Sequence, residues 1–389
     1  MTAPVFILAG EPSGDRLAAS LMRAVEAGYG PQSWIGVGGP SMRAEGLKSS
    51  HNMDQLTVMG FGSALAAYPR LSKFADRLVE DIVAARPRLV ITVDVKGFSL
   101  RLAARLRRRM ATAGWSAPII HVVAPTVWAW GAWRRHRVAR AVDGLLCLFP
   151  FEPDYFLPLG VEAHFIGHPE AFNPAYDSPR RPPADDGDRP HLVILPGSRR
   201  SEIQHLLRPM LQTLHHLRDT HPQITATIPT LPLMRADIEA VLGEVPGLSP
   251  VVTLDAEEGA LFRALGHGDA VLAASGTVTL QTALYGVPGV SCYITSGLSA
   301  AIGRRLVRMD RVILPNAILD RQVYPFLFQQ AATPGEMTRA MLKVLNDNEA
   351  TPRARQHADE LRRILRGTSD SFEDNVTRAL AGWLSPPKV

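Results

Sequence analysis

Short apolar runs alternate with longer amphipathic segments along most of the chain. Val5–Ala9 is a run of strand length, and Arg16–Ala27 after it carries apolar residues at helical spacing. Because consecutive parallel strands must be joined by a crossover, usually a helix, the repeated alternation predicts a mainly parallel, doubly wound α/β sheet. The further strands expected in the first half are Ser33–Val37, Leu89–Val93, Ile119–Val123, Gly144–Leu148 and a last one at Phe165–Ile166.

A polar stretch interrupts this pattern. Asn173–Pro190 is rich in Pro, Asp and Arg and has almost no apolar residues, a composition typical of interdomain linkers. The pattern resumes at His191, so we expect an N-terminal domain at 1–172, a linker at 173–190 and a C-terminal domain at 191–389. The second domain's expected strands are Leu192–Leu195, Gln223–Pro229, Val251–Leu254, Ala270–Ala273 and Val290–Ile294, and its terminal helices are Met337–Leu345, Ala354–Leu365 and Phe372–Leu384.

The composition describes a globular chain with ample core: 46% of the 389 residues are hydrophobic and 20% are charged. Cys147 and Cys292 form no CxxC pair, so we expect buried thiols in a reducing cytoplasm and neither a disulfide framework nor a zinc knuckle. The N-terminus lacks the basic region of a secretory signal. The uncharged stretch Ala270–Gly303 is punctuated by Gly, Ser, Thr and Pro, which argues against a membrane span.

The charge favours acidic partners. A formal charge of +5 and a pI near 9.4 suit phosphates, nucleotides or anionic lipid headgroups. No nucleic acid is expected as a partner, because no recognition-helix, zinc-finger or RNA-binding aromatic signature is present. Neither a Walker A pattern nor GxGxxG occurs, which argues against P-loop ATPases and dinucleotide-binding enzymes. His164 and His168 lie in a strand and turn, so we expect no metal ion and no other cofactor.

The stretch His191–Leu207, HLVILPGSRRSEIQHLL, is an apolar strand that runs into a turn and opens a helix. Gly197 breaks the strand, and Ser198 or Ser201 can cap the helix, whose first amides and dipole attract an anion. Arg199 and the arginine after it add guanidinium groups suited to bidentate phosphate contacts. The stretch predicts a diphosphate site, and an ordinary strand-to-helix connection with surface arginines is the alternative.

A second turn has the same character. Ser275, Gly276 and Thr277 follow an apolar strand and begin a helix, and Gln281 lies one turn further. Ligands of open parallel sheets bind at the carboxyl ends of the strands, so this turn is also expected at a phosphate or ribose.

In the first domain, the turn after the first strand offers small residues and carboxylates. Gly10 and Gly14 allow the backbone to approach a ligand, and Glu11 and Asp15 can accept hydrogen bonds from sugar hydroxyls. The alternative is a tight turn capped by Asp15.

Asp94 stands at the end of an apolar strand, where an ionised carboxylate is costly unless a cleft or hydrogen bonds solvate it. It is therefore the candidate general base, with Lys96 nearby as a phosphate contact or a solvated cation. A helix N-cap or a salt-bridged structural Asp is the alternative.

The run Ala124–Trp133, APTVWAWGAW, places Trp128, Trp130 and Trp133 beside Arg134. Aromatic faces with cations suit a sugar, a lipid or a nucleotide phosphate. The alternative is an amphipathic helix whose tryptophans fill the core, and it fits Trp133 better than Trp128.

Nine short motifs occur in order along nearly the whole chain. They are GEPSGD (10–15), GVGGPSM (36–42), VMGF (58–61), APTVWAW (124–130), PFE (150–152), GHP (167–169), LPGSRRSEI (195–203), ASGTVTLQ (274–281) and LPN (314–316). In these motifs the chain resembles the lipid-A-disaccharide synthases. That family implies the GT-B glycosyltransferase architecture, in which two doubly wound Rossmann-like domains face a central cleft.

The resemblance implies a reaction and roles for residues. The family transfers 2,3-diacylglucosamine from UDP to 2,3-diacylglucosamine 1-phosphate with inversion, giving the lipid A disaccharide 1-phosphate and UDP. Asp94 would take the acceptor proton, Arg199 would stabilise the leaving diphosphate, and Asn316 is the third expected catalytic residue. The expected substrate contacts are Gly10, Glu11, Ser13, Gly14, Asp15, Trp128, Gly197, Ser198, Ser275, Gly276, Thr277, Gln281, Tyr293 and Gln329.

The chain also departs from the family's pattern. Gly97 and Ser99 stand where an Asp and an Asn are usual, and Ser63, Gln281 and Phe326 stand where Glu is typical. An amide is a weaker acceptor than a carboxylate, so the contact expected at Gln281 is weakened. A weak or inactive nucleotide-sugar or lipid-binding relative with altered substrate, or a UDP-sugar epimerase of the same architecture, remains an alternative.

Acylated substrates imply a cytoplasmic enzyme that is peripheral on the inner face of the cytoplasmic membrane. The segment Phe61–Phe74 suits an interfacial helix on anionic lipid. Its expected membrane or acyl contacts are Phe61, Leu65, Tyr68 and Leu71. The alternative is an amphipathic helix packed on the sheet. The family also implies a possible homodimer.

Overall fold

The computed structural model describes residues 3–56, 61–129, 131–177, 189–294 and 312–384. They form two compact units. Unit 1 comprises residues 1–172 and 364–389, and unit 2 comprises residues 173–363.

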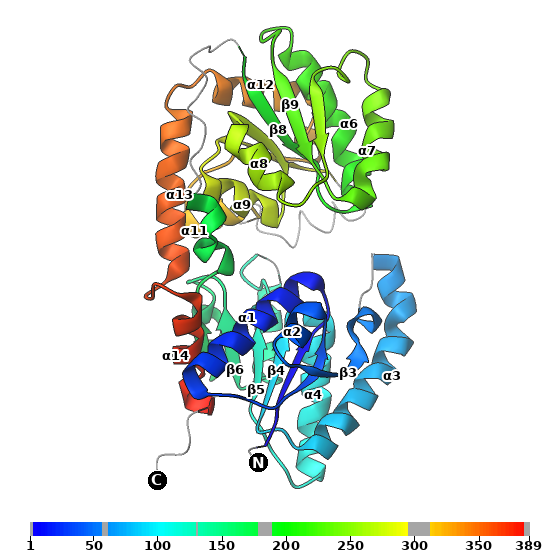
Figure 1. Ribbon diagram of the computed structural model, residues 1–389, viewed down its shortest axis with the longest axis vertical. Coiled ribbons are helices and arrows are strands. Elements are labelled where there is room, and N and C mark those ends of the chain that lie inside the picture. The colour runs from blue at the N-terminus through cyan, green and yellow to red at the C-terminus, as the bar shows by residue number, and fades with distance from the viewer. Residues whose placement is uncertain (1–2, 57–60, 130, 178–188, 295–311, 385–389) are drawn as a thin grey trace. The chain divides into compact units, whose positions relative to one another are not determined.

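Unit 1 is built on a seven-stranded parallel sheet with the order β3-β2-β1-β4-β5-β6-β7 (Figure 1). Its strands are β1 (Val5–Ala9), β2 (Trp34–Gly38), β3 (Lys48–Asn52), β4 (Leu89–Val93), β5 (Ile119–Val122), β6 (Gly144–Cys147) and β7 (Glu162–Phe165). Its helices are α1 (Pro12–Tyr29), α2 (Pro40–Ala44), α3 (Phe61–Ala85), α4 (Lys96–Thr112), α5 (Arg135–Ala139) and α14 (Phe372–Leu384). The doubly wound α/β prediction is confirmed, because helices cover both faces: α3 and α4 pack on one and α1 and α14 on the other.

The strand β3 was not predicted, because its sequence KSSHN is polar and its residues are exposed or half-buried. Such an edge strand has no apolar signature and is recruited by main-chain pairing with β2.

The last helix, α14, packs on unit 1, whereas the sequence placed it at the end of the C-terminal domain. Phe372, Val376 and Leu380 are buried in the same cluster as Leu21 and Met22 of α1. The contact is close, and Figure 1 shows the two helices side by side. An amphipathic terminal helix needs an apolar surface to cover, and its own sequence does not specify which sheet supplies that surface.

Gly36 allows β2 to pass against β1. Its φ is +144°, and a Cβ at this position would lie 1.9 Å from the carbonyl oxygen of Ile7. We expect Gly36→Ala to destabilise unit 1 by roughly 2–4 kcal/mol, since main-chain atoms of a central strand cannot move aside. Tryptophan fluorescence during urea unfolding measures this directly, because all six tryptophans belong to unit 1.

Gly97→Ala in α4 is the matched control. No atom lies within 4 Å of the position its Cβ would take, so the change should alter unfolding by less than about 1 kcal/mol. Equal unfolding midpoints for the two variants would contradict the steric argument.

Unit 2 contains a six-stranded parallel sheet with the order β10-β9-β8-β11-β12-β13. Its strands are β8 (His191–Leu195), β9 (Thr225–Pro229), β10 (Val252–Asp255), β11 (Ala270–Ala274), β12 (Gly289–Tyr293) and β13 (Phe326–Phe328). Its helices are α6 (Arg200–Leu217), α7 (Arg235–Gly243), α8 (Ala260–His267), α9 (Thr277–Tyr285), α11 (Leu314–Leu319), α12 (Pro334–Leu345) and α13 (Ala350–Arg366). The helices α6 and α12 pack together over one face of this sheet.

The two cysteines are buried free thiols, as predicted. Burial raises the pKa of Cys292 to about 12 and raises that of Cys147 as well. Neither thiol is poised to react at neutral pH.

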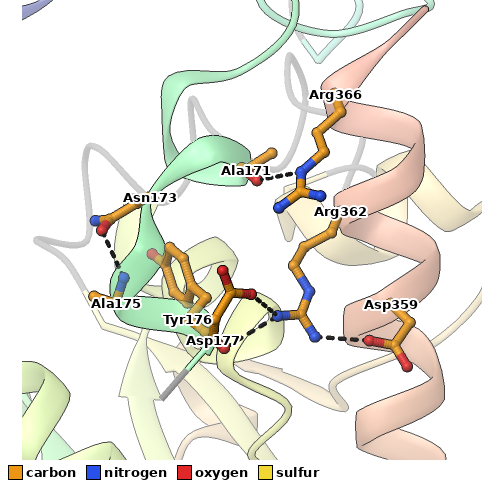
Figure 2. Close-up of polar contacts among 8 residues, drawn as sticks. All are labelled: Ala171, Asn173, Ala175, Tyr176, Asp177, Asp359, Arg362 and Arg366. Atoms are coloured by element: carbon orange, nitrogen blue, oxygen red, sulfur yellow. Dashed lines mark hydrogen bonds and ion pairs between the residues drawn. The ribbon is translucent and has the colours of Figure 1, made fainter. Parts of the chain in front are cut away.

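The beginning of the expected linker is packed in unit 2. Tyr176 is buried and its ring lies edge-on to Phe262 and Tyr285. Figure 2 shows Arg362 of α13, which donates to the Tyr176 carbonyl at 3.0 Å and pairs with the Asp177 carboxylate at 3.5 Å. Within unit 1, Arg366 donates to the carbonyl of Ala171 at 2.8 Å (Figure 2). The chain passes from unit 1 to unit 2 after residue 172. It is held by Arg366 before this point and by Arg362 after it, each within its own unit.

Candidate active site

Unit 2 has a cavity of about 900 Å³ at the carboxyl ends of β8, β9, β11 and β12. The sequence placed a ligand at this end of the strands, where the loops of an open parallel sheet meet. The structure brings together here most of the residues predicted for the second domain. Those that line the cavity are Gly197, Ser198, Arg199, Ser275, Gly276, Thr277, Gln281 and Tyr293.

The start of α9 is an open anion cradle. Gly276 is its N-cap, and Thr279 donates to the Gly276 carbonyl through both its amide and its hydroxyl. Among the described residues, the amides of Gly276, Thr277 and Val278 have no hydrogen-bond partner, and all three residues line the cavity. Free amides and the positive end of a helix dipole together favour the binding of an anion at such a helix start.

The start of α6 is arranged differently. The Glu202 carboxylate accepts hydrogen bonds from the amides of Ser198 at 3.1 Å and Arg199 at 3.3 Å. The helix begins with Arg199 as its N-cap, so the expectation that Ser198 or Ser201 caps it is wrong. Glu202 was missed, although an acidic residue at the third position of a helix is a recognisable capping signal.

Arg199 extends its guanidinium from this turn. The side chain is 78% exposed and its Nη1 lies 3.2 Å from the Glu202 carboxylate. The following Arg200 turns elsewhere and pairs with Asp237 at 2.8 Å. Only the first of the two adjacent arginines therefore lines the cavity.

Tyr293 ends β12 on the cavity wall. Burial raises the pKa of its phenol, the Glu202 carboxylate raises it further, and Arg199 opposes the shift. The phenol therefore stays protonated at neutral pH and can donate a hydrogen bond.

Asn316 has a structural task in α11. Its Oδ1 accepts from the amides of Val323 and Tyr324, both at 2.9 Å, and its Nδ2 donates to the Tyr324 carbonyl at 2.8 Å. These contacts hold the following loop, and the expected catalytic role of Asn316 stays a prediction. Gln329, just beyond β13, has a φ of +54°, which is uncommon for a residue other than glycine, and its substrate role stays a prediction.

In unit 1, the main chain is strained where β4 and β5 end. Asp94 and Val95 have φ values of 51° and 43°, and Val123 has 72°. Such conformations cost about 1–3 kcal/mol each and cluster at functional sites. The Ser99 hydroxyl donates to the Asp94 carbonyl at 2.8 Å. The family departure at Ser99 therefore contributes to holding Asp94 in place.

Asp94 is half-buried, and the N-cap of α4 is Val95, so the N-cap alternative for Asp94 is wrong. The loop after β1 lies beside it. A Cβ on Gly10 would be 2.8 Å from the Val95 side chain. The general-base role of Asp94 stays a prediction, and so does the alternative of a salt-bridged structural Asp.

Asp15 is used by the protein itself. It is 2% exposed, and its carboxylate accepts from the amides of Gly39, Ser41 and Met42 at 2.8, 2.9 and 3.2 Å. The expected sugar contact is therefore corrected: Asp15 anchors the start of α2. Gly14 is buried with it, whereas Glu11 and Ser13 are exposed at the start of α1 and remain predicted substrate contacts.

Trp128 and Trp133 are placed opposite to the prediction. Trp128 is 4% exposed, and its Nε1 donates to Glu152 at 3.2 Å, while Trp133 is 63% exposed. Glu152 also accepts from the amides of Leu148 and Phe149. Trp128 is thus a core anchor rather than an open sugar platform, because the segment folds as turns and not as an amphipathic helix. Trp130 lies outside the described residues.

Buried His168 belongs to the same neighbourhood. Its ring lies 5.6 Å from that of Phe149, and its Nδ1 accepts from the amide of Glu170 at 3.2 Å. Burial lowers its pKa to about 4, so the ring is neutral at physiological pH.

The helix α3 packs on the core of unit 1, as the alternative expected, and its membrane contact stays a prediction. Leu71 is half-buried and packs against the core, while Tyr68 is 47% exposed beneath the guanidinium of Arg101 at 5.0 Å. The side chains of Phe61 and Leu65, like those of Ser63 and Lys96, lie outside the described part. In the part of the chain that the structure describes, none of the helices combines the length and apolar character needed to cross a bilayer.

A model of the lipid-A-disaccharide synthetase family matches residues 5–378. The chain belongs to this family.

Relatives named lipid-A-disaccharide synthase cover most of the chain. The protein from Rhodospirillum centenum is 40% identical over 359 residues, 90% of this chain and 86% of its own length. The protein from Nitrobacter winogradskyi is 34% identical over 384 residues, 97% and 95% of the two lengths. Membership in the lipid-A-disaccharide synthetase family makes this protein a hexosyltransferase of lipid A synthesis.

Solved structures show the same architecture. A structure of S. aureus MnaA with UDP has a TM-score of 0.63 at 13% identity and covers 99% of this chain and 97% of its own. The glycotransferase of kitacinnamycin has a TM-score of 0.61 at 16% identity, with coverage of 98% and 100%. These likenesses confirm the GT-B fold predicted for the lipid-A-disaccharide synthetase family.

Proposed function

We propose that the protein transfers 2,3-diacylglucosamine from UDP to 2,3-diacylglucosamine 1-phosphate with inversion at the anomeric carbon. The products are the lipid A disaccharide 1-phosphate and UDP. The observation that carries the proposal is the unit 2 cavity, in which the open start of α9 and the exposed Arg199 offer amide and guanidinium donors. These are the donors that a diphosphate leaving group requires.

The mechanism assigns one task to each group. The acceptor hydroxyl attacks the anomeric carbon, and Asp94 takes its proton as the new carbon–oxygen bond forms. The bond to UDP breaks, and its electron pair leaves with the diphosphate. The amides of Gly276 and Thr277 and the Arg199 guanidinium stabilise the charge that develops there.

An epimerase is the weaker candidate. The solved UDP-GlcNAc 2-epimerase from Neisseria meningitidis, with a TM-score of 0.59, is only 10% identical to this chain and shares its fold alone. The relatives at 34–40% identity are named synthases.

Incubation with both acylated sugars tests the function. We expect UDP release that needs the acceptor and gives stoichiometric disaccharide, measured by coupled UDP detection and mass spectrometry. UDP-N-acetylglucosamine, which carries a single acetyl group in place of the two acyl chains, is the control donor and should be a poor substrate. Tight UDP binding without turnover would support an inactive relative, and isomerisation of the donor without acceptor would support an epimerase.

The acylated substrates place the proposed reaction at the inner face of the cytoplasmic membrane, with the protein peripheral. The exposed Tyr68 and the cation of Arg101 above its ring suit a lipid–water interface. A homodimer is part of the proposal, and light scattering in detergent measures it.

A further inference from the structure

The two helix starts that line the unit 2 cavity differ in one respect. The amides at the start of α9 are open to the cavity, whereas those of Ser198 and Arg199 are occupied by the Glu202 carboxylate. A carboxylate and a phosphate can each accept hydrogen bonds from such amides. The protein thus fills one of its two anion cradles with a charge of its own.

The carboxylate is fitted closely to the turn. Gly197 has a φ of +109°, and a Cβ on it would lie 2.3 Å from Glu202 Oε2. The Glu202 side chain is 13% exposed, and its other oxygen is 3.2 Å from the Arg199 guanidinium. Three donors of the turn therefore converge on one carboxylate.

The negative charge of Glu202 also affects another residue of the cavity lining. It contributes to the raised pKa of Tyr293, which also lines the cavity. A diphosphate that enters the cavity would meet this charge, and like charges in a half-buried site repel.

We propose that Glu202 is a built-in competitor of the nucleotide diphosphate. It occupies the Gly197–Arg199 turn in the ligand-free protein and leaves when a phosphate group takes the same amides and the Arg199 guanidinium. The phosphate wins because it carries more charge and more acceptor oxygens than a carboxylate. This inference rests on the proposed function, because a bound diphosphate is the group that displaces Glu202. Its consequence is a weakened hold on UDP, which favours release of the product.

Glu202→Gln tests the competition. The amide keeps the side chain's length and one acceptor oxygen but removes the charge. We expect the Kd of UDP, measured by isothermal titration calorimetry, to fall by about 2- to 10-fold, because a screened charge contributes on this scale. The Kd of uridine, which has no phosphate, should not change. A side chain that only stabilises the turn would give the opposite sign, namely weaker UDP binding.

Glu258→Gln is the matched control, since it removes the same charge from an exposed carboxylate at the cavity rim without touching the turn. It should change UDP affinity much less than Glu202→Gln. A crystal structure with UDP supplies the second measurement, and Glu202 is expected to have left the amides of Ser198 and Arg199. Unchanged or weaker UDP binding by Glu202→Gln, or a carboxylate still on the turn beside bound UDP, overturns the proposal. Wild-type UDP release with both sugars is measured separately, so the proposed function and the role of Glu202 can fail independently.

Discussion

Replacing Asp94 with Asn is expected to lower turnover by about 10²- to 10⁴-fold while leaving UDP affinity unchanged. General-base catalysis contributes on this scale, and an amide cannot accept the proton of the attacking hydroxyl. Asp94 belongs to unit 1, whereas the cavity proposed to bind UDP is lined by residues of unit 2. The loss should therefore appear in kcat and not in the Kd of UDP.

Asparagine is the sharper substitution here for a conformational reason. Asp94 has a φ of 51°, and Asn adopts this left-handed conformation more readily than Ala does. Asp94→Asn thus removes the base without adding backbone strain, so the fold should be retained. Circular dichroism and the unfolding midpoint confirm that retention.

Asp54→Asn is the control, because Asp54 is an exposed carboxylate of the same unit. It should leave UDP release at the wild-type rate. An Asp94→Asn enzyme that keeps wild-type turnover would remove Asp94 from the mechanism.

Replacing Arg199 with Ala is expected to lower turnover by about 10²- to 10³-fold. Removing one preorganised donor to a developing negative charge has this effect in other enzymes. Because the charge on the diphosphate grows as the bond breaks, kcat should fall, and UDP binding should weaken as well. Stability should hardly change, since the exposed pair of Arg199 with Glu202 contributes at most about 1 kcal/mol.

Two further variants distinguish the positive charge of Arg199 from the shape and position of its guanidinium. Arg199→Lys keeps the charge but loses the planar fork, so its rate should lie between those of the wild type and Arg199→Ala. Arg200→Ala removes a neighbouring guanidinium that pairs with Asp237 outside the cavity, and it should be nearly as active as the wild type. Equal losses for Arg199→Ala and Arg200→Ala would show that general positive charge, and not the placed guanidinium, is what the reaction needs.

The strands and turns that were predicted correctly are those with a clear local pattern in the sequence. Apolar runs such as Leu89–Val93 and Ala270–Ala274 became buried parallel strands, because both faces of a doubly wound sheet are covered by helices. The turns at Gly197–Arg199 and Ser275–Thr277 also formed where the apolar runs stop, and both line one cavity. The edge strand Lys48–Asn52 was missed, because main-chain pairing rather than side-chain pattern created it.

The use of each polar side chain was harder to predict. Asp15 and Asn316 stand in motifs that also suit a substrate site, yet the structure commits both to nearby amides and carbonyls. Conversely, Glu202 was not predicted as a site residue. Its carboxylate nevertheless occupies the Gly197–Arg199 turn, which the sequence predicted as a diphosphate site. A carboxylate bonds to whichever donors the fold brings within about 3 Å, and a linear pattern does not contain that information.

Periodicity and ordered motifs, read along the chain alone, were enough to establish two parallel α/β sheets, the GT-B fold and the family, since each depends on residues close together in sequence. Three-dimensional packing alone decided that α14 joins unit 1, that Asp15 holds α2, that Trp128 is buried, and that α6 and α9 present one filled and one open cradle. These outcomes depend on contacts between residues far apart in the chain, or on competition among donors for one acceptor. The free energies of these contacts are therefore determined only in the fully packed structure.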